Sequence, residues 1–145
     1  MDEGELTELL EQATGLSLDC TIALLHQHAP TQATSMMIKR LEKDPYGNVS
    51  GLFESLTGAN LGQDSPTLLR LATQCLTSSH EASALAAAGL LQQWIEAGNT
   101  LEVAPLARAL AHWQAVDMKQ SSFIPSEIAF VLGELCEKAS VVAGT

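Results

Sequence analysis

Four histidines are the side chains of this sequence best suited to acid–base or metal chemistry: His26, His28, His80 and His112. His26 and His28 are two positions apart, which on a helix directs them to different faces, so we do not expect them to share a metal ion. His80 is expected in the first turn of a helix, where the positive end of the helix dipole disfavours protonation of the ring. A neutral imidazole at that position suits a general base.

His112 stands next to Trp113 in an alanine-rich segment, shortly before Asp117. An imidazole and a carboxylate close together can move a proton on a bound molecule, and an indole can pack against it. One hypothesis is therefore a small helical ligand-binding protein or enzyme centred on His112 and Trp113. Its site would be completed by Asp117 and by His80 facing them.

The same histidines are similar in type and order to those of the globins, in a chain that is expected to hold about as many helices. The resemblance implies that His112 ligates a haem iron, that His80 lines the opposite side and that Phe53 packs on the ring. Too few residues follow His112 for the two long helices that close a globin. We therefore predict no cofactor and no metal.

Three cysteines, Cys20, Cys75 and Cys136, are widely spaced and odd in number, which does not suit a disulfide framework. We expect three buried free thiols in a reducing compartment. The N-terminus lacks the basic start and apolar core of a secretory signal, and no apolar run is long enough to span a bilayer. These features predict a soluble cytoplasmic protein.

The 145-residue chain is strongly acidic, with 7 Lys and Arg against 17 Asp and Glu and a formal net charge of −10. Phosphate backbones and anionic lipids repel such a chain, so nucleic-acid and membrane binding are disfavoured. An acidic face keeps a protein soluble and can also steer a partner with a basic surface.

Flexible methionines are the positive signal for the leading hypothesis. Met36, Met37 and Met118, together with Phe53, could line an adaptable apolar groove for another protein. Since no motif converges on a catalytic centre, we predict a protein–protein interaction module without catalytic activity: an adaptor, a chaperone-like protein, an immunity-type inhibitor or an assembly subunit. Association into homo-oligomers is the third alternative.

The elements that would position these side chains are helical nearly throughout, because apolar residues recur at intervals of three and four. Helix ends and starts are marked by prolines, turn residues and capping residues: Pro30, the turn at residues 44–48, Ser65-Pro66, Ser78–Glu81 and Pro125-Ser126. About eight helices result, and their approximate ranges are 6–13, 17–29, 36–41, 49–56, 66–76, 81–97, 104–115 and 126–139. Ser17 is expected to cap the second helix, and Pro105 delays or kinks the seventh.

We predict an all-α fold in which residues 1–145 form a single helical domain, with a candidate subdivision at the glycine-rich segment 58–64. Consecutive apolar stripes must cover one another, which favours a compact orthogonal bundle of seven to eight helices. A short α-solenoid of stacked helical hairpins over residues 66–142 is the alternative.

Residues 6–42 read as three short helices with Thr14-Gly15 after the first. This stretch is similar to the ubiquitin-associated-like three-helix module. The resemblance implies contacts to ubiquitin from the loop at Thr14, Gly15 and Leu16 and from the apolar end of the third helix at Ile38 and Leu41. The sequence departs from that family in having Ala29-Pro30 where many members carry an aromatic residue.

Overall fold

Eight α-helices make up the regular structure of this chain in a computed structural model that describes residues 2–57, 65–120 and 126–143. No strand occurs in these described ranges, so the all-α prediction is confirmed. The helices are α1 (Glu3–Gln12), α2 (Gly15–His28), α3 (Ala33–Lys43), α4 (Ser50–Leu56), α5 (Ser65–Cys75), α6 (Glu81–Glu96), α7 (Val103–Lys119) and α8 (Glu127–Ala143).

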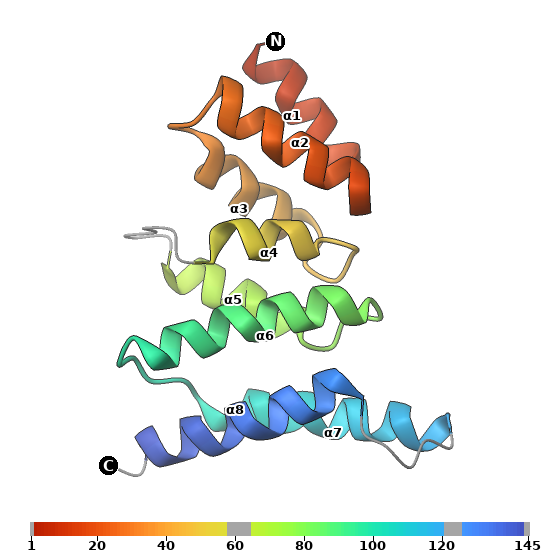
Figure 1. Cartoon of the computed structure of the whole chain (residues 1–145), viewed down its shortest axis with the longest axis vertical. Helices are drawn as coiled ribbons and strands as arrows, with labels where there is room; N and C mark the ends of the chain where they lie inside the picture. The colour runs from red at the N-terminus through yellow and green to blue at the C-terminus, as the bar shows by residue number, and fades with distance from the viewer. Residues whose placement is uncertain (1, 58–64, 121–125, 144–145) are drawn as a thin grey trace.

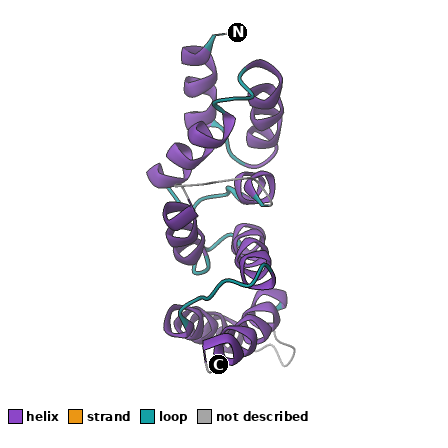
Figure 2. Ribbon diagram, turned by 90° about the vertical axis from the view of Figure 1, so that its left-hand side faces the viewer, coloured by secondary structure: helices purple, strands orange, loops and turns teal. Residues whose placement is uncertain are grey.

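The helices follow one another along the longest axis of the molecule, from α1 at one end to the α7–α8 hairpin at the other (Figure 1). Seen from the side, they form two layers, with the odd-numbered helices in one and the even-numbered helices in the other (Figure 2). In the even-numbered layer α2 packs on α4, α4 on α6 and α6 on α8. The arrangement of α5 to α8 resembles the predicted alternative of stacked helical hairpins over residues 66–142. Similar stacking continues from α4 back to α1.

The space between the layers is filled by one set of buried apolar side chains drawn from all eight helices. Packing of this kind places the interior-facing stripe of each helix against its neighbours in both layers. The glycine-rich segment 58–64 lies outside the described residues, so the division of the chain into domains stays a prediction.

The turn between α1 and α2 is tied to the turn between α3 and α4 through Gly15. Gly15 has a φ of +57°, and its N–H donates to the Asn48 carbonyl at 3.2 Å. Thr14, not Ser17, is the N-cap of α2, and the Ser17 hydroxyl accepts from the Thr14 N–H at 3.0 Å. The prediction of Ser17 as the cap is therefore wrong by one turn, because the left-handed glycine lets the helix begin directly after α1.

Two buried serines join the same α3–α4 turn to the start of α6. The Ser78 hydroxyl donates to the Tyr46 carbonyl, and the Ser83 hydroxyl donates to the Gly47 carbonyl at 3.0 Å. The Ser78 hydroxyl also accepts from the His80 N–H at 3.1 Å, and His80 occupies the N-cap position of α6. At α7, the helix begins at Val103, so Pro105 lies in its first turn, where a proline costs no helical hydrogen bond.

Candidate functional site

The residues predicted to form a site around His112 do not form one together. Two of them are exposed to solvent, and the other two make structural hydrogen bonds. His112 is exposed on α7, and His80 is exposed at the start of α6. The Trp113 indole is buried, and its Nε1–H donates to the Leu76 carbonyl at 2.6 Å, which fastens α7 to the end of α5. Asp117 Oδ2 accepts from the Ser126 backbone N–H at 3.0 Å and thereby fixes the start of α8.

The chemistry expected of this group therefore has no support in its geometry, since the indole and the carboxylate are occupied by structural hydrogen bonds. No cluster of three or more His, Cys, Asp or Glu in the described ranges could hold a metal ion. Phe53, which the globin resemblance would place on a haem, is completely buried in the core.

The four residues predicted to line an apolar groove do not share a surface. Met37 is 1% exposed and Phe53 0%, so neither can meet a partner without rearrangement. Met36 is also buried, next to α1, whereas Met118 is 80% exposed near the far end of α7. Met36 and Met37 are buried because α3 packs against α1, α2, α4 and α5, and Phe53 is buried because α4 packs against α2 and α6.

The same packing bears on the ubiquitin-associated-like resemblance. Ile38 and Leu41, the apolar end of the third helix, are buried inside the stack. Leu16 is exposed, but the second half of the implied contact surface is covered by other helices of this chain. In that family three helices form a whole module, whereas here α1, α2 and α3 are the first helices of a longer stack.

An opening in the described part of the chain lies between α5 and α7. In the odd-numbered layer α3 contacts both α1 and α5, whereas among the described helices the contact between α5 and α7 is smaller. The two helices meet at the Trp113–Leu76 hydrogen bond. Away from it, the residues before α7 and the first half of α7 stand apart from α5, which leaves a groove of about 500 Å³.

The base of this α5–α7 groove is apolar. Leu91 of α6 and Leu106 of α7 are buried beneath it, and Leu69, Leu101 and Pro105 are partly exposed along its sides. Leu101 comes from the connection between α6 and α7, so the groove is formed by three segments distant in sequence. An apolar base with partly exposed walls can take up apolar side chains of a ligand and release the water that covers them.

The polar residues around the groove are two cations, one anion and three neutral side chains: Arg70, Arg108, Glu102, Thr73, Gln74 and Thr100. Both arginines are exposed. Neither forms a hydrogen bond or an ion pair with any residue in the part of the chain that the structure describes. Their guanidinium groups are therefore available to a ligand.

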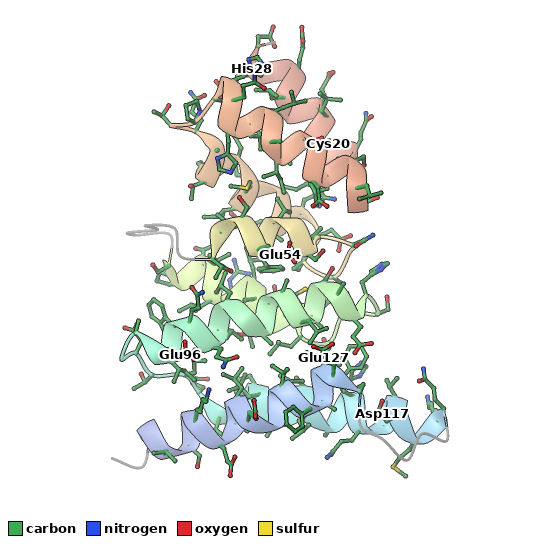
Figure 3. The ribbon with its side chains drawn as sticks, in the orientation of Figure 1. Cys20, His28, Glu54, Glu96, Asp117 and Glu127 are labelled. Carbon is green, nitrogen blue, oxygen red and sulfur yellow. The ribbon has the colours of Figure 1, made fainter. Side chains whose placement is uncertain are left out.

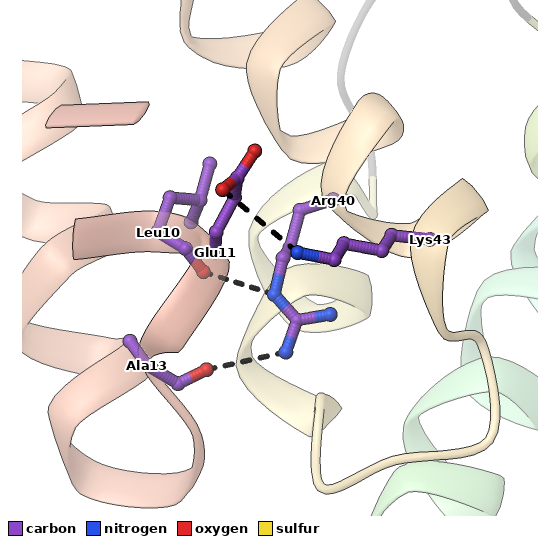
Figure 4. Close-up of polar contacts among 5 residues, drawn as sticks. All are labelled: Leu10, Glu11, Ala13, Arg40 and Lys43. Carbon is purple, nitrogen blue, oxygen red and sulfur yellow. Dashed lines mark hydrogen bonds and ion pairs between the residues drawn. The ribbon is translucent and has the colours of Figure 1, made fainter. Parts of the chain in front are cut away.

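A second, smaller opening of about 160 Å³ lies between α1 and α3, where the only basic cluster of the sequence is found. Arg40 crosses it: its Nε donates to the Leu10 carbonyl at 2.9 Å and its Nη2 to the Ala13 carbonyl at 3.3 Å (Figure 4). Lys43 Nζ lies 3.8 Å from a Glu11 carboxylate oxygen. This opening is therefore bridged by side chains of the protein itself.

The three thiols differ in their surroundings. Burial, with a smaller contribution from the Asp44 carboxylate, raises the pKa of Cys75 to about 12, and burial also raises the pKa of Cys136. A thiol that stays protonated is a poor nucleophile. Cys75 is buried, Cys136 is partly buried and Cys20 is exposed on α2 (Figure 3), so the expectation of three buried thiols is confirmed for Cys75 alone.

The residues that line the α5–α7 groove were not predicted from the sequence. The one local signal is Pro105, which with the Asn99–Glu102 segment delays the start of the seventh helix. That α7 then stands apart from α5, which ends 28 positions before α7 begins, depends on tertiary packing.

Comparisons with known proteins found no matching family model, no matching curated protein and no matching solved structure. Within the described residues, no helix is both long enough and apolar enough to cross a membrane.

Proposed function

We propose that this chain is a protein–protein interaction module and that its partner binds in the α5–α7 groove. The observation that carries the proposal is the opening itself, about 500 Å³ in size, with an apolar base and, at its edge, two arginines that have no partner among the described residues. Protein interfaces combine these two properties, an apolar centre that excludes water and a polar rim that fixes orientation.

Two further features support an interaction role. Stacked helical hairpins present extended surfaces to partners. Their stability comes from contacts between neighbouring hairpins, so one opening between two helices does not prevent folding. The described histidines and carboxylates do not converge on the groove, and Glu102 is the only one of them that lines it. We also propose an intracellular location, because the exposed free thiol of Cys20 suits a reducing compartment.

The test is affinity capture of the partner from the lysate of the source cells with the wild-type chain and two matched variants. Leu101→Asp places a carboxylate on the side of the groove. Leu16→Asp makes the same chemical change on α2, at a side chain that is 84% exposed and remote in sequence from the groove. Thermal unfolding of each variant confirms that it folds.

We expect a partner that is recovered near stoichiometry with the wild type and with Leu16→Asp, and that is reduced roughly tenfold with Leu101→Asp, because a charge is forced into an apolar contact. Equal recovery with both variants would overturn the groove as the binding site. Loss with Leu16→Asp alone would overturn it as well and would place the partner on α2.

A further inference from the structure

Of the seven lysines and arginines of this acidic chain, three have partners among the described residues, and four, Lys39, Arg70, Arg108 and Lys119, have none. Arg40 is buried against backbone carbonyls, Lys43 lies near Glu11, and Lys138 Nζ lies 3.9 Å from a Glu96 carboxylate oxygen. Arg70 and Arg108 have no such partner among the described residues, and both lie at the α5–α7 groove. The groove therefore carries unneutralised positive charge on a chain whose net charge is −10.

The two arginines come from different sides of the groove. Arg70 belongs to α5 and Arg108 to α7, so a ligand that lies between these helices meets a guanidinium group from each. Arginine presents a planar fork of N–H donors that matches a carboxylate. Glu102 is the only acidic residue that lines the groove, which leaves a local excess of one positive charge.

We infer that the segment bound in the α5–α7 groove is acidic as well as apolar, with its carboxylates paired to Arg70 and Arg108 and its apolar side chains on the base. This inference rests on the proposed function and names the chemistry of its partner. The expectation of a basic partner, which follows from the overall charge, does not apply to this groove, because a basic segment would be repelled by two arginines.

The size of the groove favours a short segment. The groove lies between α5 and the first half of α7, and further along α7 the Trp113–Leu76 hydrogen bond joins α7 to the end of α5. A few apolar side chains fill a space of this size, and their neighbours in sequence then lie at the rim, next to the arginines. Alternating apolar and acidic side chains satisfy both parts of the site.

The experiment measures binding of two fluorescein-labelled peptides to the full chain by fluorescence anisotropy. One is built from the repeat Leu-Glu-Glu-Leu-Leu-Glu-Glu, and the other has every Glu replaced by Lys. We expect the wild-type chain to bind the acidic peptide at least about tenfold more tightly than the basic one, and to lose this preference as salt rises from about 50 to about 500 mM.

Three variants assign the preference to the groove. Arg70→Glu and Arg108→Glu are each expected to weaken binding of the acidic peptide by roughly tenfold, the effect of losing a charge-assisted hydrogen bond and gaining repulsion. Lys39→Glu is the matched control, since it reverses an exposed charge at the α1–α3 opening, and it should change affinity less than about twofold.

Each contrary outcome has a distinct meaning. No preference for the acidic peptide, or equal losses with Lys39→Glu and the two arginine variants, would overturn the acidic-segment inference. If Leu101→Asp still reduces partner capture in that case, the groove remains the binding site and the charge argument alone fails. A wild-type chain whose solution mass shows a dimer, dissociated by Arg108→Glu, would identify a second copy as the occupant and would overturn the inference of a separate partner.

Discussion

The openings between α1 and α3 and between α5 and α7 occur at equivalent places, each between successive helices of the odd-numbered layer. The first measures about 160 Å³ and is crossed by Arg40, whereas the second measures about 500 Å³ and is crossed by no described side chain that forms a hydrogen bond or ion pair from one side to the other. The difference shows how this fold uses positive charge. The buried Arg40, which bridges two helices, is part of the fold, whereas the exposed Arg70 and Arg108 at the α5–α7 groove have no such partner among the described residues.

The role of Arg40 follows from the end of α1. The last carbonyls of a helix have no partner within it and carry partial negative charge. Arg40 supplies donors to the Leu10 and Ala13 carbonyls, which compensates the cost of burying its guanidinium group at 7% exposure. Arg70 and Arg108 stay hydrated, so each contributes little to the free energy of folding.

The largest effect that tests this comparison is expected from Arg40→Met. Methionine fills much of the same volume but leaves the Leu10 and Ala13 carbonyls without their donors, so the free energy of unfolding should fall by about 3 kcal/mol. Arg70→Met, an identical change at the open groove, should alter it by less than about 0.5 kcal/mol. Urea denaturation followed by circular dichroism measures both, and similar losses in the two variants would contradict the division of roles.

A second pair of variants compares the two glycines with positive φ in the described ranges, one near each opening. Gly15 has a φ of +57°, and a Cβ added there would lie 3.0 Å from Asn48 Nδ2; Gly98 has a φ of +95° and open space around that position. Alanine at Gly98 meets backbone strain alone, about 1–2 kcal/mol, and alanine at Gly15 adds the crowding against Asn48.

We therefore expect both variants to lower the urea midpoint and Gly15→Ala to lower it further. The same measurement on Gly133→Ala is the control, because Gly133 lies inside α8 with nothing near its added Cβ. This variant should be stabilised by roughly 0.5–1 kcal/mol. A larger loss at Gly98 than at Gly15 would show that the α1–α2 turn is not held as tightly as its hydrogen bond to Asn48 indicates.

The smallest effect is expected at the contact between α7 and the end of α5. Trp113→Phe keeps an aromatic ring but removes the Nε1–H donor to the Leu76 carbonyl, and the free energy of unfolding should fall by about 1–2 kcal/mol. Trp94→Phe removes an exposed indole bond, from Nε1–H to the Thr100 carbonyl at 3.2 Å, and should cost less. Equal costs would mean that Trp113 does not fasten α7 to α5.

Local signals predicted the helices well because most are set by interactions within a few residues. The regular apolar spacing of α8 and the proline that delays α7 each act within one or two turns. The predicted site residues were less successful, since burial depends on neighbours that the sequence does not place. Met37 and Phe53 are residue types that can form an adaptable binding surface. Because α3 and α4 lie inside the stack, both are core residues instead.

The sequence by itself determined the helical class, the acidic charge and the approximate number of helices, because periodicity, composition and turn residues are properties of the chain alone. Only the tertiary structure decided that Arg40 is buried while Arg70 and Arg108 are free, and that α7 stands apart from α5. The reason is physical: the environment of a side chain is set by helices that reach it from distant parts of the sequence, and their placement depends on the packing of the whole stack.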